Sequence, residues 1–259
     1  MPAREYASDR RRFDVVFCDV DGCLLPEETR PADVGVLLRL AEHNALAESD
    51  RDRPVIVPCT GRPQPFCEAV CKMLGRFDRI PAICEHGGYR YFFEDHRWEL
   101  EPSITDRDQE AIRAAERWTE QHLGPHGCFL ELGKHTGVTI IHHNVEYLHR
   151  DLMPAIRDAN DSDGWGFEVA TTWTCVNLKL PHVSKARAIA RTIEELGLDR
   201  SRLAGIGDTM GDLAIREQVA WFGCPGNALD ELKAHADAVA QAPIAAGTLE
   251  LIQLLSATA

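Results

Sequence analysis

The segment from Phe13 to Phe17 constrains the fold more than any other part of this 259-residue chain. It is a short run rich in aromatic and β-branched residues, which predicts a strand buried inside a sheet. Two carboxylates separated by one residue, Asp19 and Asp21, follow the strand, and Gly22 comes next. Ligands of a parallel α/β sheet bind just beyond the carboxyl ends of its strands. We therefore expect both acids at a mouth of the sheet, where a divalent cation would make their mutual repulsion tolerable.

Taken alone, the tetrad Asp19 to Gly22 is better explained as a solvated turn, because aspartate and glycine are common turn residues and short motifs occur by chance. A second predicted strand, Pro54 to Cys59, also carries candidate residues at its end. It ends in Thr60-Gly61-Arg62, just before a predicted helix. A hydroxyl group and free backbone N–H groups in such a position can bind a phosphate oxygen. The alternative role for Thr60 is a helix N-cap, and the two roles are compatible.

A third predicted strand, Leu203 to Gly207, ends in Asp208, and Asp212 follows four residues later. Lys185 is the first residue of a predicted helix, and Ser184 directly before it is a typical N-cap residue. Each of these residues has an ordinary explanation, as a turn aspartate or an exposed helical lysine. Their joint occurrence, each at its own strand end or helix start, indicates a single site.

Composition limits the classes of partner and the compartment. Hydrophobic residues make up 44% and charged residues 27%, as in a soluble globular protein, and the net charge is -13. This charge argues against nucleic acid or an anionic membrane as partner, although a local basic pocket is compatible with it. No apolar run approaches the ~20 residues that cross a bilayer. The polar start, Met1 to Arg12, has no segment of signal-peptide type, so we expect a cytoplasmic protein. The nine cysteines are scattered without a Cys-x-x-Cys pair, which predicts reduced structural thiols.

The hydrophobic pattern between Tyr89 and Lys179 differs from that of the flanking segments, because predicted helices alternate there with half-buried strands. We therefore expect two domains. Residues 1–88 and 180–259 would form an α/β core with a Rossmann-like, doubly wound parallel sheet. Residues 89–179 would form an inserted α+β cap, joined through Gly87-Gly88 and Leu180-Pro181.

The motifs resemble those of the haloacid dehalogenase superfamily of phosphohydrolases. Asp19-Val20-Asp21-Gly22 is similar to its first motif, Thr60-Gly61-Arg62 to its second, Lys185 to its third and Gly207 to Asp212 to its fourth. A domain inserted between the second and third motifs is similar to the subgroup with a large α/β cap. That subgroup includes sucrose-phosphate, mannosyl-3-phosphoglycerate and Cof-like phosphatases. Cys23 and Gly211 depart from the pattern, which most often has threonine and asparagine there.

The resemblance implies roles for these residues. Asp19 would attack phosphorus to form an aspartyl-phosphate, and Asp21 would act as general acid and then general base. Lys185 and the Thr60–Gly61 pair would neutralise phosphoryl charge. Mg²⁺ would be the cofactor, and further residues would shape the phosphate site. The implied metal ligands are Asp19, the backbone carbonyl of Asp21, Asp208 and Asp212, and the implied substrate-binding residues are Gly61, Arg62 and Asn227.

We therefore expect a Mg²⁺-dependent phosphomonoester hydrolase that acts on a small phosphorylated metabolite, with a sugar phosphate as the favoured class. The alternatives are a phosphomutase of the same superfamily and a non-catalytic metabolite-binding protein on the same fold. A homodimer through the insertion is compatible with the sequence. Eight side chains could reach the organic part of a substrate, namely Glu85, His86, Arg90, Lys134, His135, His142, His143 and Lys179.

Overall fold

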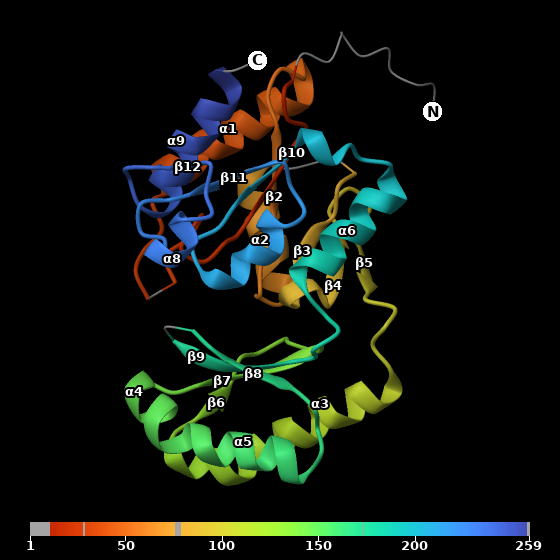
Figure 1. Cartoon of the computed structure of the whole chain (residues 1–259), viewed down its shortest axis with the longest axis vertical. Coiled ribbons are helices and arrows are strands. Elements are labelled where there is room, and N and C mark those ends of the chain that lie inside the picture. The colour runs from red at the N-terminus through yellow and green to blue at the C-terminus, as the bar shows by residue number, and fades with distance from the viewer. Residues whose placement is uncertain (1–10, 28, 76–78, 173, 258–259) are drawn as a thin grey trace.

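The computed structural model describes residues 11–27, 29–75, 79–172 and 174–257, which form a larger body and a smaller one below it in the view of Figure 1. The larger body contains a parallel sheet with the strand order β12-β11-β10-β1-β2. Its strands, in chain order, are β1 (Val15–Cys18), β2 (Val55–Pro58), β10 (Leu203–Ile206), β11 (Trp221–Cys224) and β12 (Ala238–Val239). The strands predicted at residues 13–17, 54–59 and 203–207 are all present, and β1 lies between the other two.

Helices cover both faces of this sheet, as a doubly wound fold requires. One face packs on α1 (Val34–Asp50), α2 (Gln64–Leu74) and α9 (Ile244–Ala257). The other face packs mainly on α6 (Lys185–Leu196), α7 (Leu213–Arg216) and α8 (Asp230–Lys233). Strands buried on both faces read as continuous apolar runs, which is why the run before Asp19 predicted this fold correctly.

The register of the parallel strands brings three chain segments to one edge of the sheet. Cys18 at the end of β1 lies opposite Pro58 of β2 and Ile206 of β10. The residues that follow these three positions, including Asp19, Thr60 and Asp208, therefore emerge at the same edge.

A second, three-stranded antiparallel sheet extends the larger body. It consists of β3 (Ala82–Cys84), β4 (Tyr89–Phe92) and β5 (Arg97–Leu100), and a bridge between Cys59 and Ile83 joins it to the main sheet. Tyr91 of β4 is fully buried among the cysteines of α2 and β3. The buried guanidinium of Arg90 lies 2.6 Å from a carboxylate oxygen of Glu195 in α6. Because β4 and β5 pack on the core, we propose that the cap begins near residue 101 instead of at the expected residue 89.

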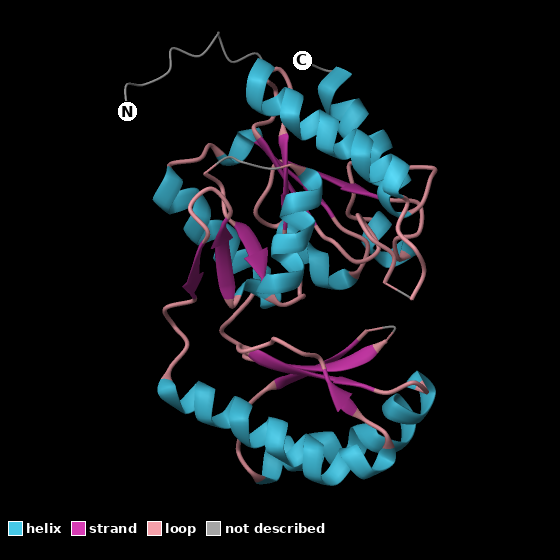
Figure 2. Cartoon of the chain, turned by 180° about the vertical axis from the view of Figure 1, so that it is seen from behind, coloured by secondary structure: helices cyan, strands magenta, loops and turns pink. Residues whose placement is uncertain are grey.

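The smaller body is a four-stranded antiparallel sheet with helices on one face. Its strand order is β6-β7-β9-β8. The elements are α3 (Asp106–Trp118), β6 (Phe129–Leu130), β7 (Gly137–Ile141), α4 (Val145–Tyr147), α5 (Met153–Ser162), β8 (Glu168–Thr171) and β9 (Cys175–Lys179). Figures 1 and 2 show α3 and α5 on the outer face of the sheet and its other face turned toward the larger body. None of the helices in the described residues combines the length and apolar character needed to cross a membrane.

Candidate active site

Lys185 connects the acids at the edge of the parallel sheet. Its Nζ donates to Oδ1 of Asp19 at 2.9 Å and to Oδ1 of Asp212 at 2.8 Å. All three side chains are buried. Burial alone would disfavour the ammonium, but the charges of Asp19 and Asp212 raise the pKa of Lys185 well above its usual value. The lysine is therefore a fixed positive charge beside Asp19.

Asp19, Asp208 and Asp212 form a compact acidic cluster. Each offers a carboxylate oxygen, and these oxygens all lie within 4.8 Å of one another. Burial, together with the neighbouring carboxylates, raises the pKa of Asp19 to about 7 and that of Asp208 to about 9. Oδ1 of Asp208 is buried and has no hydrogen-bond partner among the described residues. Three hard oxygen donors with one oxygen unpaired fit a divalent cation such as Mg²⁺.

The loops around the cluster are tightly packed. Gly22 adopts φ +75°, and a Cβ there would lie 1.9 Å from Oδ2 of Asp208, so only glycine fits. Asn227 donates from Nδ2 to the Gly22 carbonyl at 3.0 Å, and its Oδ1 accepts from the Ile244 N–H at 2.7 Å. Asn227 therefore holds two loops together, and its direct contact with a phosphate stays a prediction. Oδ2 of Asp212 accepts from the backbone N–H of Asp208 at 3.1 Å.

Thr60 lies fully buried at the end of β2. Its Oγ1 accepts from the backbone N–H of Arg62 at 3.0 Å, and its own N–H donates to the carbonyl of Ile83. The N-cap position of α2 is occupied by Pro63, so Thr60 does not cap this helix. The hydroxyl is thus held at the sheet edge beside Gly61, as the anion-site interpretation requires.

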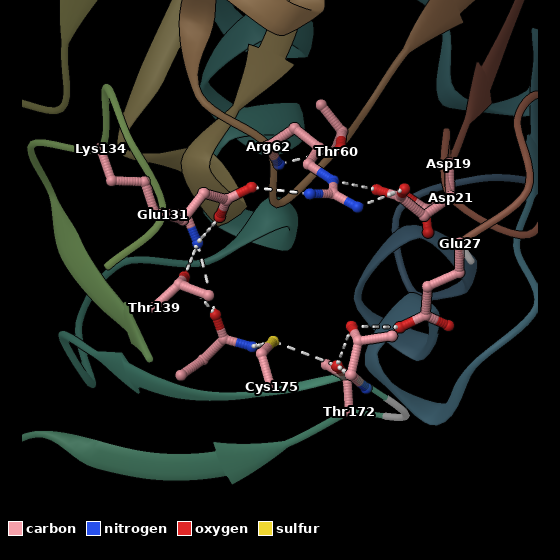
Figure 3. Close-up of polar contacts among 12 residues, drawn as sticks. Asp19, Asp21, Glu27, Thr60, Arg62, Glu131, Lys134, Thr139, Thr172 and Cys175 are labelled. Carbon is pink, nitrogen blue, oxygen red and sulfur yellow. Dashed lines mark hydrogen bonds and ion pairs between the residues drawn. The ribbon is translucent and has the colours of Figure 1, made fainter. Parts of the chain in front are cut away.

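Arg62 lies between the two bodies, as Figure 3 shows. Its Nε and Nη2 donate to the two carboxylate oxygens of Asp21 at 2.8 and 2.9 Å. Its Nη1 donates to Oε1 of Glu131 in the cap at 2.7 Å. Pairing with Asp21 and then Glu131 raises the pKa of Arg62 above its usual value. Its expected contact with a substrate stays a prediction, because both sides of the guanidinium are occupied by carboxylates.

The inner face of the cap sheet presents a polar wall to this edge. Thr139 of β7 and Asn177 of β9 are register partners, and their side chains hydrogen-bond at 2.7 Å. Lys134 lies 3.3 Å from Oδ1 of Asn177 and 3.4 Å from Oε2 of Glu131. On the other side, Glu27 of the core accepts from Thr174. Arg62, Glu131, Thr139 and Glu27 form a ring of polar groups beside Asp21 in Figure 3.

The eight expected substrate-reading side chains separate into two groups. Glu85, His86, Lys134 and Lys179 line one small cavity between the core and the cap. Arg90 instead pairs with Glu99 and Glu195. The remaining three are placed elsewhere: the ring of His142 lies 2.8 Å from the Asn144 carbonyl, His143 is exposed, and the backbone of His135 donates to Glu85.

Comparison with known proteins agrees with this architecture. The family model of haloacid dehalogenase-like hydrolases matches residues 167–252. A phosphoglycolate phosphatase of Archaeoglobus fulgidus is 28% identical over 78% of this chain and 82% of its own length. A phosphoglycolate phosphatase of Methanospirillum hungatei is 22% identical over 92% of this chain and 95% of its own length. This chain is a phosphatase similar to those of the haloacid dehalogenase superfamily.

Solved structures share the fold over almost the whole phosphatase. Protein 0175 of Thermoplasma acidophilum superposes with a TM-score of 0.72 at 18% identity, covering 95% of this chain and 99% of that one. A haloacid dehalogenase-like hydrolase from Bacteroides thetaiotaomicron has a TM-score of 0.68 at 16% identity, with coverages of 94% and 99%. The sucrose-phosphatase of Synechocystis sp. PCC6803 has a TM-score of 0.60 at 15% identity, with coverages of 95% and 98%.

Sequence reasoning named Lys134 but missed Thr139 and Asn177 of the polar wall of this phosphatase, although β7 and β9 carry a signal for them. Thr139 interrupts an apolar run between Val138 and Ile140, which are both buried in the cap core. Neighbouring strand residues point to opposite faces, so the polar residue between two core residues must face away from the helices. Of the two departures from the superfamily pattern, Cys23 is buried, whereas Gly211 is exposed with room for a side chain.

Proposed function

We propose that this phosphatase is a Mg²⁺-dependent phosphomonoester hydrolase acting on a small phosphorylated metabolite. The observation that carries the proposal is the placement of Asp19. Its carboxylate lies at the end of the central strand, fixed by the ammonium of Lys185 at 2.9 Å and next to the unpaired oxygen of Asp208. Phosphoryl transfer needs a nucleophile, a positive charge and a set of metal ligands in one place. The carboxylate of Asp19, the ammonium of Lys185 and the carboxylate of Asp208 match these needs.

The chain's own residues account for two displacements. Asp19 attacks phosphorus, so that the phosphoryl group passes to its carboxylate and the alkoxide leaves. Asp21 enters the cycle protonated, gives its proton to the leaving oxygen, and regains one from the attacking water; between these steps Arg62 pairs with both oxygens of its carboxylate. Lys185 and the Thr60–Gly61 turn offset the negative charge that moves onto the phosphoryl oxygens. Attack by water then releases inorganic phosphate and frees the carboxylate of Asp19.

Asp19, Asp208 and the backbone carbonyl of Asp21 are the proposed ligands of Mg²⁺, and Asp212 orients the outer shell. When bound, the cation would neutralise phosphoryl charge and relieve the repulsion that raises the pKa of Asp19 and Asp208. The raised pKa values of Asp19 and Asp208 also support a cation at this place, since the ionised forms of both carboxyl groups are disfavoured without a positive charge nearby.

For the substrate we propose a sugar phosphate, with phosphoglycolate as a second candidate. The polar wall on the cap, formed by hydroxyl, amide and charged groups, suits a substrate rich in hydroxyl groups. The second candidate is favoured by the names of the Archaeoglobus fulgidus and Methanospirillum hungatei relatives, which cover most of this chain. The cytoplasmic location and the homodimer expected from the sequence stay predictions.

The test is phosphate release from p-nitrophenyl phosphate, with Mg²⁺ and with excess chelator. We expect turnover in Mg²⁺, loss of at least about 100-fold in chelator, and recovery when Mg²⁺ is restored. A phosphomutase would transfer the group within a sugar phosphate with little release, and a binding protein would release none. Full turnover in chelator, with no metal found by elemental analysis, would contradict the metal assignment.

A further inference from the structure

A small cavity lies between the core and the cap, close to the turn at Gly61. It is lined by the turn at Glu85 and His86 and by Lys134, Asn177 and Lys179 of the cap. Its volume of about 10 Å³ is room for the centre of about one water-sized group. Lys134 and Asn177 also belong to the polar wall of the cap, so the cavity adjoins the space that the organic part of a substrate would occupy.

Glu85 brings an unsatisfied acceptor to this cavity. The residue is 3% exposed. Oε2 accepts from the backbone N–H groups of His135 and Thr136 at 2.8 and 2.7 Å and from the Thr136 hydroxyl at 2.8 Å. Oε1 is buried and has no partner in the described part of the chain. An unpaired buried carboxylate oxygen is costly, so the site calls for a donor from a bound group.

His86 brings the complementary group. Its imidazole lies directly on Gly61, where an added Cβ would come within 2.4 Å of the ring. Burial, Lys134 and Lys185 lower the pKa of His86 well below the usual value, so the ring is neutral. A neutral imidazole offers one N–H donor and one acceptor nitrogen.

The backbone at this turn is strained, which points to a functional constraint. Glu85 has φ 49° and His86 has φ 57°, so two consecutive residues other than glycine adopt the left-handed region. Such strain costs free energy and persists where the surrounding structure imposes it. Here it directs both side chains toward the junction of core and cap.

We propose that Glu85 and His86 form a hydroxyl-binding subsite for the organic part of the substrate. A hydroxyl group donates to Oε1 of Glu85 and accepts from the imidazole N–H of His86. An anionic group would be repelled by Glu85, and an ammonium group by Lys134 and Lys179, so a neutral hydroxyl is the ligand that satisfies both. The inference rests on the proposed function and narrows its substrates to phosphate esters that carry a hydroxyl group close to the phosphate.

The test compares two esters with the same three-carbon skeleton, glycerol 3-phosphate and propyl phosphate. Their binding to the full-length Asp19→Asn protein in Mg²⁺ is measured by titration calorimetry, so the readout needs no turnover. We expect glycerol 3-phosphate to bind about tenfold more tightly, as one well-placed hydrogen bond allows. Adding His86→Ala or Glu85→Gln should reduce this preference to less than about threefold.

The variants are matched to the contacts of the subsite. The amide that Glu85→Gln introduces would keep an oxygen for the cap donors, and circular dichroism checks folding. His143→Ala, which changes an exposed histidine of the cap, is the matched control and should keep the full preference.

Equal binding of the two esters, or a preference that survives in folded His86→Ala, would overturn the subsite and would leave a water molecule as the occupant of the cavity. If Glu85→Gln fails to fold, His86→Ala decides the question. The proposed function fails separately: a hydroxyl preference in binding, without phosphate release by the wild-type protein, would uphold the subsite and reject the hydrolase.

Discussion

At the scale of residues, the pairing with Arg62 sets the orientation of the carboxyl group of Asp21, the proposed general acid. A guanidinium grips both oxygens of a carboxylate in one plane, which fixes the rotation of the side chain as well as its position. Lysine is a point charge on a flexible stem and cannot reproduce this fork. The pair therefore suggests that Arg62 positions Asp21 for proton transfer.

Arg62→Lys should slow substrates that need a proton on the leaving group. We expect kcat for an alkyl phosphate such as glycerol 3-phosphate to fall about 10- to 100-fold, because a misaimed acid protonates an alkoxide poorly. The rate with p-nitrophenyl phosphate should fall much less, since nitrophenolate leaves without help. The measurement is kcat for both esters.

Arg202→Lys provides the matched control. Arg202 forms the same two-oxygen fork with Asp14, but at the opposite end of β1 from the site. We expect this variant to leave the ratio of the two rates unchanged. An equal loss with both esters in Arg62→Lys would mean that Arg62 does not act through Asp21.

The sequence could predict the acids but not this pairing, and the reason is physical. Asp19 and Asp208 directly follow buried strands, and parallel strands bring such positions to one edge whatever the loops do. The contact between Arg62 and Glu131 joins residues 69 positions apart on two separately folded bodies. It depends on how the cap docks, which no local pattern encodes. The turn at His86 was likewise among eight candidates that only the docked structure could separate.

At the scale of elements, the two faces of the cap sheet have different tasks. Val138, Ile140 and Leu178 pack under the cap helices, whereas Thr139 and Asn177 on the same strands face the site. The pattern predicted the cap strands and helices, because half-buried antiparallel strands alternate polar and apolar residues. The pattern placed the cap boundary at residue 89 and not at the proposed residue 101, since β4 and β5 alternate in the same manner but pack on the core.

Replacement of residues 104–181 by a short glycine-serine linker tests whether the cap chooses the substrate. The core groups handle only the phosphoryl unit, so we expect p-nitrophenyl phosphate to be hydrolysed still. The preference for glycerol 3-phosphate over propyl phosphate should be lost, because Glu85 and His86 remain in the core but lose the cap groups that hold and enclose them. The measurement is kcat/KM for each of the three esters, with circular dichroism to establish the fold. A folded variant that keeps the wild-type preference would assign the cap to dimerisation or stability instead.

At the scale of the whole molecule, the core and cap meet around the site on several sides. Arg62 contacts Glu131, Glu27 contacts Thr174, and Glu85 holds the backbone of Thr136. This arrangement would keep bulk water away from an aspartyl-phosphate while one positioned water attacks it. The net charge of -13 does not reveal the positive groups of the site, because Lys185, Lys134 and Arg62 are gathered there within an acidic protein.

The central claim is that the molecule transfers a phosphoryl group to Asp19, and the most direct measurement is the rate of phosphate release by Asp19→Asn in Mg²⁺. Loss of the nucleophile should lower kcat for p-nitrophenyl phosphate at least about 1,000-fold, with the fold intact by circular dichroism. Asp14→Asn, at the start of the same strand and outside the site, is the control and should retain the wild-type rate. If folded Asp19→Asn keeps more than about a tenth of the wild-type rate, Asp19 is not the nucleophile.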